Sequence, residues 1–87
     1  LAASAQYWIG NSHFNLKDYK SAIASQQELI SQYPKSPKVP DAMLNIATCQ
    51  QNMGDAGTAK KTLEDVLARF PLSDAADKAK RRLEMMK

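Results

Sequence analysis

The sequence has little of what a catalytic or metal centre needs. Its 87 residues include one histidine, His13, and one cysteine, Cys49, so no internal disulfide and no histidine–cysteine ligand cluster can form. It contains no glycine-rich phosphate loop, and no histidine adjoins Cys49 to activate it. We therefore expect neither an enzyme nor a cofactor or metal site, and we expect Cys49 to be a small buried core residue.

Long apolar runs and turn-forming residues are scarce as well. No apolar stretch approaches the roughly 18 residues that a membrane span needs, so we expect no direct membrane insertion. Three glycines and four prolines are too few for a low-complexity chain. β-branched residues are also few, which favours helices over strands. Because the chain begins at Leu1 without a signal-peptide pattern, we expect a fragment or a processed chain.

The charge balance is mildly basic, with a net charge of +3. The densest group of cations comprises Lys78, Lys80, Arg81 and Arg82. This group has three interpretations: a solvated helix face, part of a protein-binding groove, or a site for nucleic acid or anionic lipid. Because no aromatic residues alternate with these cations, we expect no nucleic-acid partner.

The sequence repeats itself. A shift of 37 residues aligns Ile9 with Ile46, Gly10 with Ala47, Asp18 with Asp55, Ala22 with Ala59, Leu29 with Val66, and Pro34 with Pro71. A third copy begins after Pro71, and only its first helix would be complete. Such repeats are typical of stacked helix pairs, each of which needs its neighbours to bury its apolar faces.

Apolar periodicity predicts five helices, at roughly residues 4–16, 19–33, 38–53, 56–70 and 74–87. The stripes that we expect to be buried are Ala5, Trp8, Ile9, Ser12 and Leu16; Ala22, Ile23, Gln26, Leu29, Ile30 and Tyr33; Ala42, Met43, Ile46, Ala47, Gln50 and Met53; Ala59, Leu63, Val66, Leu67 and Phe70; and Ala75, Ala76, Ala79, Leu83 and Met86.

Local signals set the expected helix boundaries. Asp18, Asp55 and Ser73 precede three of the helices and can cap them by accepting a backbone N–H. Gly54 allows the left-handed turn that ends the helix before it. Turns as short as these make neighbouring helices antiparallel.

The two copies carry the phrases YWIGNSHF, DYKSAI and YP, then MLNIATCQ, GDAGTAKKTL and FP. These phrases resemble the tetratricopeptide repeat, although His13 and Gln50 replace its tyrosine and the period exceeds the usual length of about 34 residues. The resemblance implies an all-α, right-handed α-solenoid of helix hairpins, with two repeats plus a C-terminal capping helix. We expect one domain over 1–87, with repeat one at 3–36, repeat two at 40–73 and the capping helix at 74–87. His13 would then serve in packing or partner contact.

A closer resemblance rests on the phrases YPKSPKVPDAMLNI, GDAGTAKKTLEDVLARFP and AKRRLEMM. They are very similar to the C-terminal repeat domain of the Tol-Pal system family of YbgF, also called the cell division coordinator CpoB. This resemblance implies a periplasmic protein that contacts TolA and helps coordinate peptidoglycan synthesis with outer-membrane constriction during cell division. It also implies a full-length homo-oligomer, formed through an N-terminal coiled coil that is missing here. Another periplasmic tetratricopeptide adaptor, or a structural spacer without a ligand, is the alternative.

In tetratricopeptide arrays the first helices line a concave groove that holds a segment of a partner protein. Placed by repeat position, the groove residues here are Tyr7, Asn11, Phe14, Asn15, Leu44, Asn45, Thr48, Gln51, Asn52, Lys78, Arg81 and Arg82. In the alternative, Phe14 packs under the helix end and the other residues form ordinary surface.

Some members of the family hold a C-terminal carboxylate in a clamp of asparagine and basic residues. Four matching residue types fall on the clamp positions here, namely Asn11, Asn45, Lys78 and Arg82, and Tyr7 occupies the fifth. A groove without carboxylate specificity is the competing hypothesis.

Overall fold

Five helices account for most of the computed structural model, which describes residues 2–86. They are α1 (Ala3–Asn15), α2 (Tyr19–Gln32), α3 (Val39–Asn52), α4 (Ala56–Arg69) and α5 (Asp74–Met85). Each boundary lies within two residues of its expected position, and no strand occurs among the described residues. The all-α prediction is therefore confirmed.

The side-chain caps predicted from the sequence are formed. The Asp18 carboxylate accepts a hydrogen bond from the Ser21 N–H at 3.3 Å, and Asp55 does the same for Thr58 at 3.3 Å. The Ser73 hydroxyl accepts from the Ala76 N–H at 3.1 Å. Each cap satisfies a backbone donor that the helix itself leaves free, a contribution of about 1 kcal/mol.

The turn after α1 and the turn after α3 have the same left-handed backbone conformation but use different residues. Gly54 has a φ of +85°, and Lys17, which occupies the equivalent position in the first repeat, has a φ of +63°. A side chain in this region costs about 1–2 kcal/mol, because its Cβ crowds the following carbonyl. The first turn therefore contains local strain that the second avoids.

We expect two variants to reveal this backbone strain through their free energy of unfolding. Gly54→Ala should lower the free energy of unfolding by about 1 kcal/mol through its backbone alone, since nothing lies within 4 Å of the added Cβ. Lys17→Gly should raise it by up to about 0.5 kcal/mol, because the flexibility of glycine in the unfolded chain offsets part of the relief. Denaturant unfolding monitored by circular dichroism measures both changes, and a loss of stability in Lys17→Gly would contradict this account.

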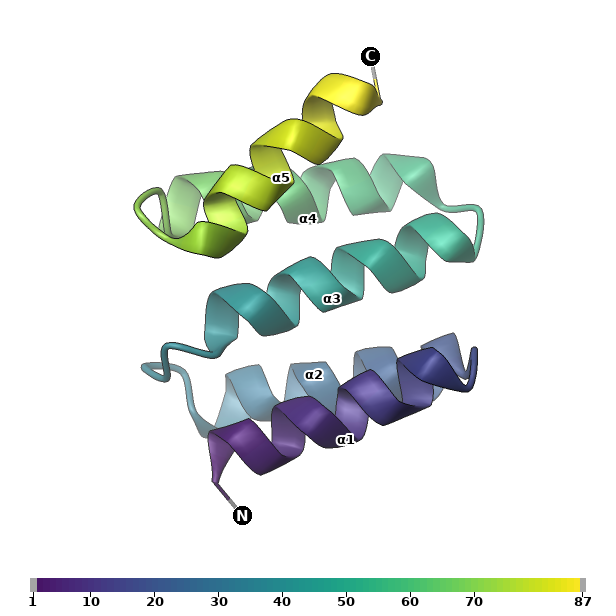
Figure 1. Cartoon of the computed structure of the whole chain (residues 1–87), viewed down its shortest axis with the longest axis vertical. Coiled ribbons are helices and arrows are strands. Elements are labelled where there is room, and N and C mark those ends of the chain that lie inside the picture. Colours follow the sequence, from purple (N-terminus) through teal and green to yellow (C-terminus); the bar gives the residue numbers. More distant parts are fainter. Residues whose placement is uncertain (1, 87) are drawn as a thin grey trace.

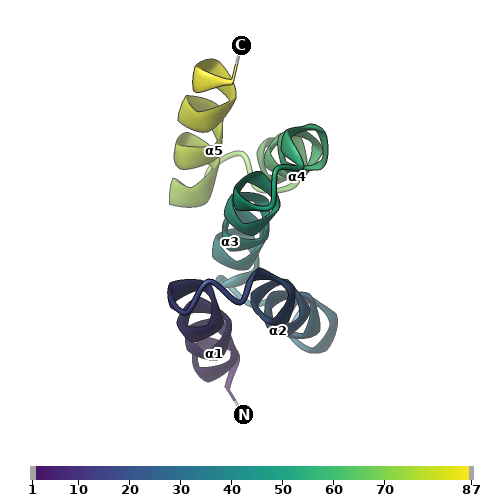
Figure 2. The same ribbon diagram turned by 90° about the vertical axis from the view of Figure 1, so that its right-hand side faces the viewer.

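The helices stack as hairpins. Helix α1 pairs with α2 and α3 pairs with α4, while α3 also contacts α2 and α5 (Figure 1). Seen from the side, α1, α3 and α5 lie along one side of the molecule, and α2 and α4 along the other (Figure 2). The molecule measures 38 × 28 × 16 Å and is an α-solenoid of helix hairpins.

The hydrophobic core is centred on α3. It joins Leu29 of α2, Val39, Ala42, Met43 and Ala47 of α3, Leu63 and Val66 of α4, and Ala75, Ala76 and Ala79 of α5. All of these core residues except Val39 belong to the stripes expected for α2, α3, α4 and α5. The main residue of those stripes that lies outside the core is Met53, which is exposed. Helix α1 contributes only the partly buried Ala3 and Tyr7.

The expected stripe of α1 is wrong. Trp8 is 58% exposed, Ile9 is 39% exposed, and Ser12 and Leu16 are also exposed. Ile46, the repeat equivalent of Ile9, is only 6% exposed, on a helix that packs against α2. Among the described residues no helix precedes α1, so the corresponding face of α1 has no partner.

Glutamines take the place of the apolar stripe where α1 meets α2. The Gln6 Nε2 donates to the Ser25 carbonyl at 3.2 Å, and the buried Gln26 Nε2 donates to the Tyr7 carbonyl at 3.2 Å. Gly10 gives room to this contact, because a Cβ there would lie 2.4 Å from Gln26 Nε2 and the Gln26 side chain would have to move. The first hairpin is thus joined by polar contacts at positions where the second has Met43 and Leu63.

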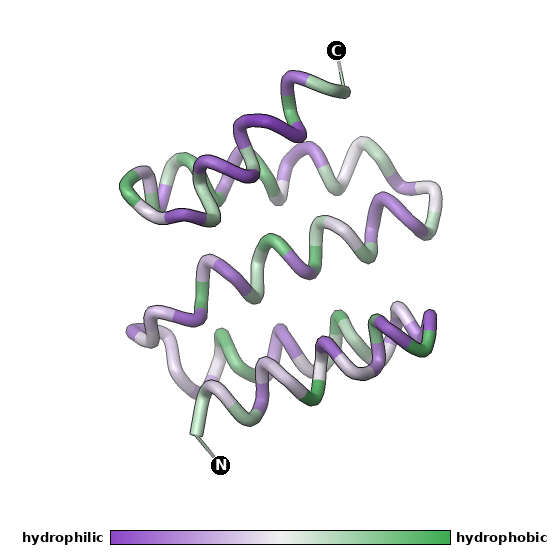
Figure 3. The backbone as a smooth tube through the Cα atoms, in the orientation of Figure 1, coloured by the Kyte–Doolittle hydropathy of each residue, from purple (hydrophilic) through white to green (hydrophobic). Residues whose placement is uncertain are grey.

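The outer face of α5 is charged. A groove beside α4 and α5 is lined by Lys60, Glu64, Lys80, Leu83, Glu84 and Met86. Lys80 and Glu84 are exposed, whereas their repeat equivalents, Met43 and Ala47, are buried against the second helix of their hairpin. Figure 3 shows α5 as largely hydrophilic. This pattern is typical of a capping helix.

Candidate protein-binding face

The first helices of the hairpins together form one side of the molecule. In the ribbon view the axis of α3 is set back between those of α1 and α5, so the backbones of the three helices follow a concave curve on this side (Figure 2). We call the side formed by α1, α3 and α5 the concave face. All twelve residues predicted for the groove belong to these three helices.

Two equivalent hydrogen bonds connect successive first helices across this face. The Asn45 Nδ2 of α3 donates to the Asn11 Oδ1 of α1 at 3.5 Å. The Arg82 guanidinium of α5 donates to the Thr48 hydroxyl of α3. Both bonds span 34 residues in sequence, because donors and acceptors are each related by the repeat. We call them the cross-repeat bonds, and they connect α1 to α3 and α3 to α5.

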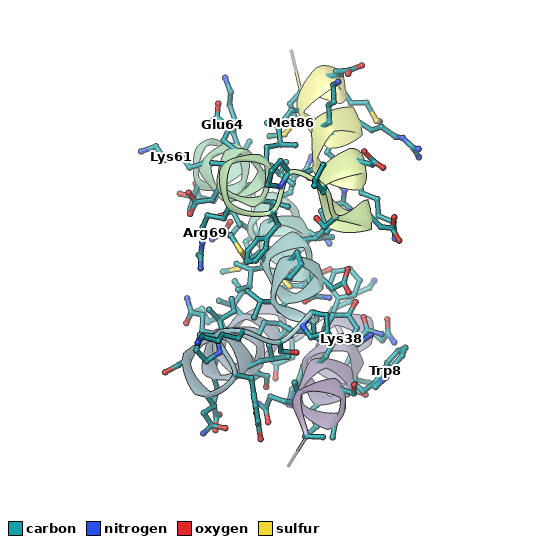
Figure 4. The ribbon with its side chains drawn as sticks, turned by 90° about the vertical axis from the view of Figure 1, so that its left-hand side faces the viewer. Trp8, Lys38, Lys61, Glu64, Arg69 and Met86 are labelled. Atoms are coloured by element: carbon teal, nitrogen blue, oxygen red, sulfur yellow. The ribbon has the colours of Figure 1, made fainter. Side chains whose placement is uncertain are left out.

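Aromatic side chains gather at the α1 end of the concave face. The rings of Tyr7 and Trp8 meet edge to face, with centroids 5.6 Å apart at 73°. The Lys38 ammonium lies 5.1 Å from the centre of the Tyr7 ring. Burial, and secondarily the nearby Asp41 carboxylate, raise the pKa of the Tyr7 phenol. Trp8 and Lys38 both project on the side away from α2 and α4 (Figure 4).

Trp8 is the site residue that sequence reasoning missed. Trp8 was expected in the core because it lies on the apolar stripe, and Tyr7, as its neighbour in sequence, was expected on the other side, in the groove. In the structure Tyr7 is half-buried against the core cluster, and Trp8 is the exposed ring. The 37-residue shift contained the signal, since it aligns Trp8 with Asn45 and Arg82, two predicted groove residues.

Cations gather at the opposite end of the concave face. Lys78 and Arg81 of α5 are exposed, and Arg82 is half-buried. Within residues 2–86 the one side-chain ion pair is that between His13 Nδ1 and Asp18 Oδ2, at 3.9 Å, so no carboxylate of this part of the chain pairs with the three cations. Lys78 and Arg81 therefore remain available to an external anion, whereas Arg82 already donates to the Thr48 hydroxyl.

The other predicted groove residues vary in exposure. Leu44 is half-buried against the core, whereas Asn15, Gln51 and Asn52 are exposed. Phe14 is half-buried, and its ring lies 5.9 Å from that of Tyr19 at the start of α2. This contact joins the last turn of α1 to the first turn of α2.

Three of the four clamp residues already have partners within the chain. Asn45 donates to Asn11, and its Oδ1 accepts from the Cys49 thiol at 3.6 Å. Arg82 donates to Thr48. A carboxylate bound in a clamp would have to displace these bonds, and this leaves Lys78 as the one clamp residue that faces solvent without such a bond.

The candidate catalytic residues show no catalytic arrangement. Cys49 is fully buried, and burial raises the pKa of its thiol to about 11, so the thiol stays protonated at neutral pH. His13 has the Asp18 carboxylate nearby but no nucleophile. No group of three metal-ligating side chains occurs among the described residues, and none of the described helices is long and apolar enough to cross a membrane.

Comparison with known proteins identifies a family. No curated protein matches the chain. The tetratricopeptide repeat model matches residues 4–36 and again residues 41–73, with the 37-residue offset found in the sequence. Proteins built from these repeats are typically protein–protein interaction scaffolds rather than enzymes. Because the two matches cover well over half of the chain, it belongs to the tetratricopeptide repeat family.

Proposed function

We propose that the chain binds a segment of a partner protein along the concave face. The observation that carries this proposal is an exposed tryptophan and a set of cations without carboxylate partners, which lie on the face whose helices the cross-repeat bonds connect. Tryptophan and arginine are the residues most often found at the energetic centres of protein interfaces. Placing them on packed helices limits the entropy lost on binding.

We further propose that the partner is TolA and that the chain is the repeat domain of a periplasmic cell division coordinator of the Tol-Pal system. The phrases YPKSPKVPDAMLNI and AKRRLEMM support this assignment. In that role the domain binds through protein–protein contacts alone, without a cofactor. A coiled coil elsewhere in the full-length protein would supply the homo-oligomer, and the domain would help coordinate peptidoglycan synthesis with outer-membrane constriction.

Titration of the chain with purified TolA tests this proposal. We expect binding that weakens about tenfold or more in Trp8→Ala, the loss typical of an aromatic anchor. Trp8 is exposed, so the variant should keep its fold. Isothermal titration calorimetry measures the affinity, and circular dichroism checks the fold. The matched control is the double variant Lys20→Gln and Lys61→Gln, which changes exposed lysines of α2 and α4 and should bind as tightly as the unaltered chain.

The outcomes separate the competing hypotheses. Failure of both this chain and a longer chain with the coiled coil to bind TolA would reject the Tol-Pal assignment, while another adaptor role would stand. Equal weakening by the control and by Trp8→Ala would reject the concave face as the binding surface. If the chain captures no partner at all, the structural spacer is the better explanation.

A further inference from the structure

Trp8 occupies a special position in the repeat. Asn45 and Arg82 each donate the cross-repeat bond to the preceding first helix. Trp8 is the equivalent residue of α1, but no first helix precedes α1 among the described residues. Its side chain is more than half exposed, and it packs edge to face on Tyr7. In α3 and α5 this repeat position therefore holds an asparagine or an arginine whose side chain donates a hydrogen bond to the preceding first helix. In α1 it holds an exposed tryptophan.

The concave face also changes in charge from end to end. At the α1 end the Lys38 ammonium lies over the Tyr7 ring, and the Asp41 carboxylate is close enough to Tyr7 to help raise the pKa of its phenol, so one cation and one anion lie beside the aromatic rings. The middle is made of the amides and hydroxyl of the cross-repeat bonds. At the α5 end Lys78 and Arg81 are exposed.

Three acidic residues of α5 lie near these cations, but within residues 2–86 none of them forms an ion pair with the cations. Asp74 lies one turn before Lys78 on α5, at the helix N-terminus, where the helix dipole stabilises its charge. It forms no ion pair with Lys78 within residues 2–86. Asp77 and Glu84 are also exposed on α5, and neither pairs with Lys78, Arg81 or Arg82. Cations that lack a partner on a concave surface favour an anionic ligand.

We infer that the segment held on the concave face has two distinct ends, an apolar side chain that packs on Trp8 and Tyr7 and a group of carboxylates beside Lys78 and Arg81. This inference rests on the proposed function, and it specifies the chemistry of the partner. The longest dimension of the molecule is 38 Å. An extended chain advances about 3.3–3.6 Å per residue, so a segment of about 11 residues is enough to reach both ends.

The two ends should contribute in different ways. The apolar end should govern how long the complex lasts, because burial of an aromatic pair depends little on salt. The acidic end should accelerate association at low ionic strength and should lose its effect as salt screens the exposed cations. A partner with the opposite charge pattern, basic at the α5 end, should be repelled.

A displayed library of random peptides of about 11 residues tests the inference whatever the identity of the natural partner. We expect the chain to enrich peptides that carry an aromatic or aliphatic residue separated from a cluster of Asp and Glu. Enriched peptides without tryptophan should shift the emission of Trp8, the one tryptophan of the sequence, to shorter wavelength on binding. Trp8→Ala should lower the affinity for these peptides about tenfold or more, whereas Trp8→Phe should retain most of the affinity.

The charged end is tested with variants of matched net charge. The double variant Lys78→Gln and Arg81→Gln should bind the enriched peptides about two- to fivefold more weakly in dilute buffer, and this difference in affinity should vanish in high salt. Lys20→Gln with Lys61→Gln removes the same charge from α2 and α4 and should have no effect. Circular dichroism melts of all variants check that the fold is kept.

The failure of this inference differs from that of the proposed function. Enriched peptides that depend on Trp8 but show no acidic preference would overturn the two-ended partner and leave the binding face in place. Enriched peptides that bind Trp8→Ala and the Lys78/Arg81 variant as tightly as the unaltered chain would reject the concave face itself. If the library yields no binder while TolA still binds the chain, the two-ended segment is overturned and the proposed function stands; if neither binds, both proposals fail.

Discussion

Ile46→Asp should unfold the protein. Ile46 is 6% exposed, on the central helix α3. An unpaired carboxylate at such a position costs several kcal/mol, while a domain of 87 residues is stable by only about 4–13 kcal/mol. We expect loss of the cooperative thermal transition in circular dichroism, or a fall of the melting temperature by tens of degrees, at about 4–8 °C per kcal/mol.

The repeat supplies a matched control for this change. Ile9 occupies the same repeat position on α1 but is 39% exposed, so a carboxylate there can reach water. Ile9→Asp should change the free energy of unfolding by only about 0.5 kcal/mol. If the two substitutions had equal effects, the packing assigned to α1 or to α3 would be incorrect.

Leu63→Ala should produce the second largest loss. Leu63 is fully buried and belongs to the core cluster that joins α2, α3, α4 and α5. Truncation of a buried leucine removes apolar contacts and leaves a cavity, at a cost of about 2–5 kcal/mol. Denaturant unfolding measures the change. Leu72 is fully exposed in the turn between α4 and α5, so Leu72→Ala should lie within about 0.5 kcal/mol of the unaltered chain.

The helices and caps could be predicted because their signals are local. A cap such as Asp55 depends on a backbone N–H three residues away, and the left-handed turn at Gly54 depends on one residue. Burial of Leu63 and Val66 follows from a stripe that recurs every three to four residues. None of these features depends on distant parts of the chain.

The packing of α1 could not be predicted in the same way. Periodicity identifies an apolar stripe, but whether a helix covers that stripe depends on the neighbours of α1. The same stripe position is buried at Ile46, where α2 lies against it, and exposed at Ile9, where the described residues provide no neighbour. Gln26 was expected in the buried stripe of α2, but Gln6, which also joins α1 to α2, lies outside the apolar stripe of α1.

The concave face could be predicted in part. The helices that form it were predictable from the repeat, and so was the basic group on α5. The internal bonds of Asn45 and Arg82 were not, because an amide or guanidinium on a helix surface can bind either a ligand or a neighbouring helix. Only the distance between α1, α3 and α5 decides between the two, and the sequence does not contain that distance in any local form.

The charged outer face of α5 has a consequence for engineered arrays. A helix added after α5 to complete its hairpin would cover Lys80 and Glu84, and taking these two charges out of water would cost several kcal/mol, which their attraction for each other would only partly offset. A hairpin added before α1 would cover Ile9 and the apolar surface around it. An array designed from this chain can therefore grow in one direction only. The α5 helix would serve as the fixed end of such an array, and the number of units would be adjusted on the α1 side.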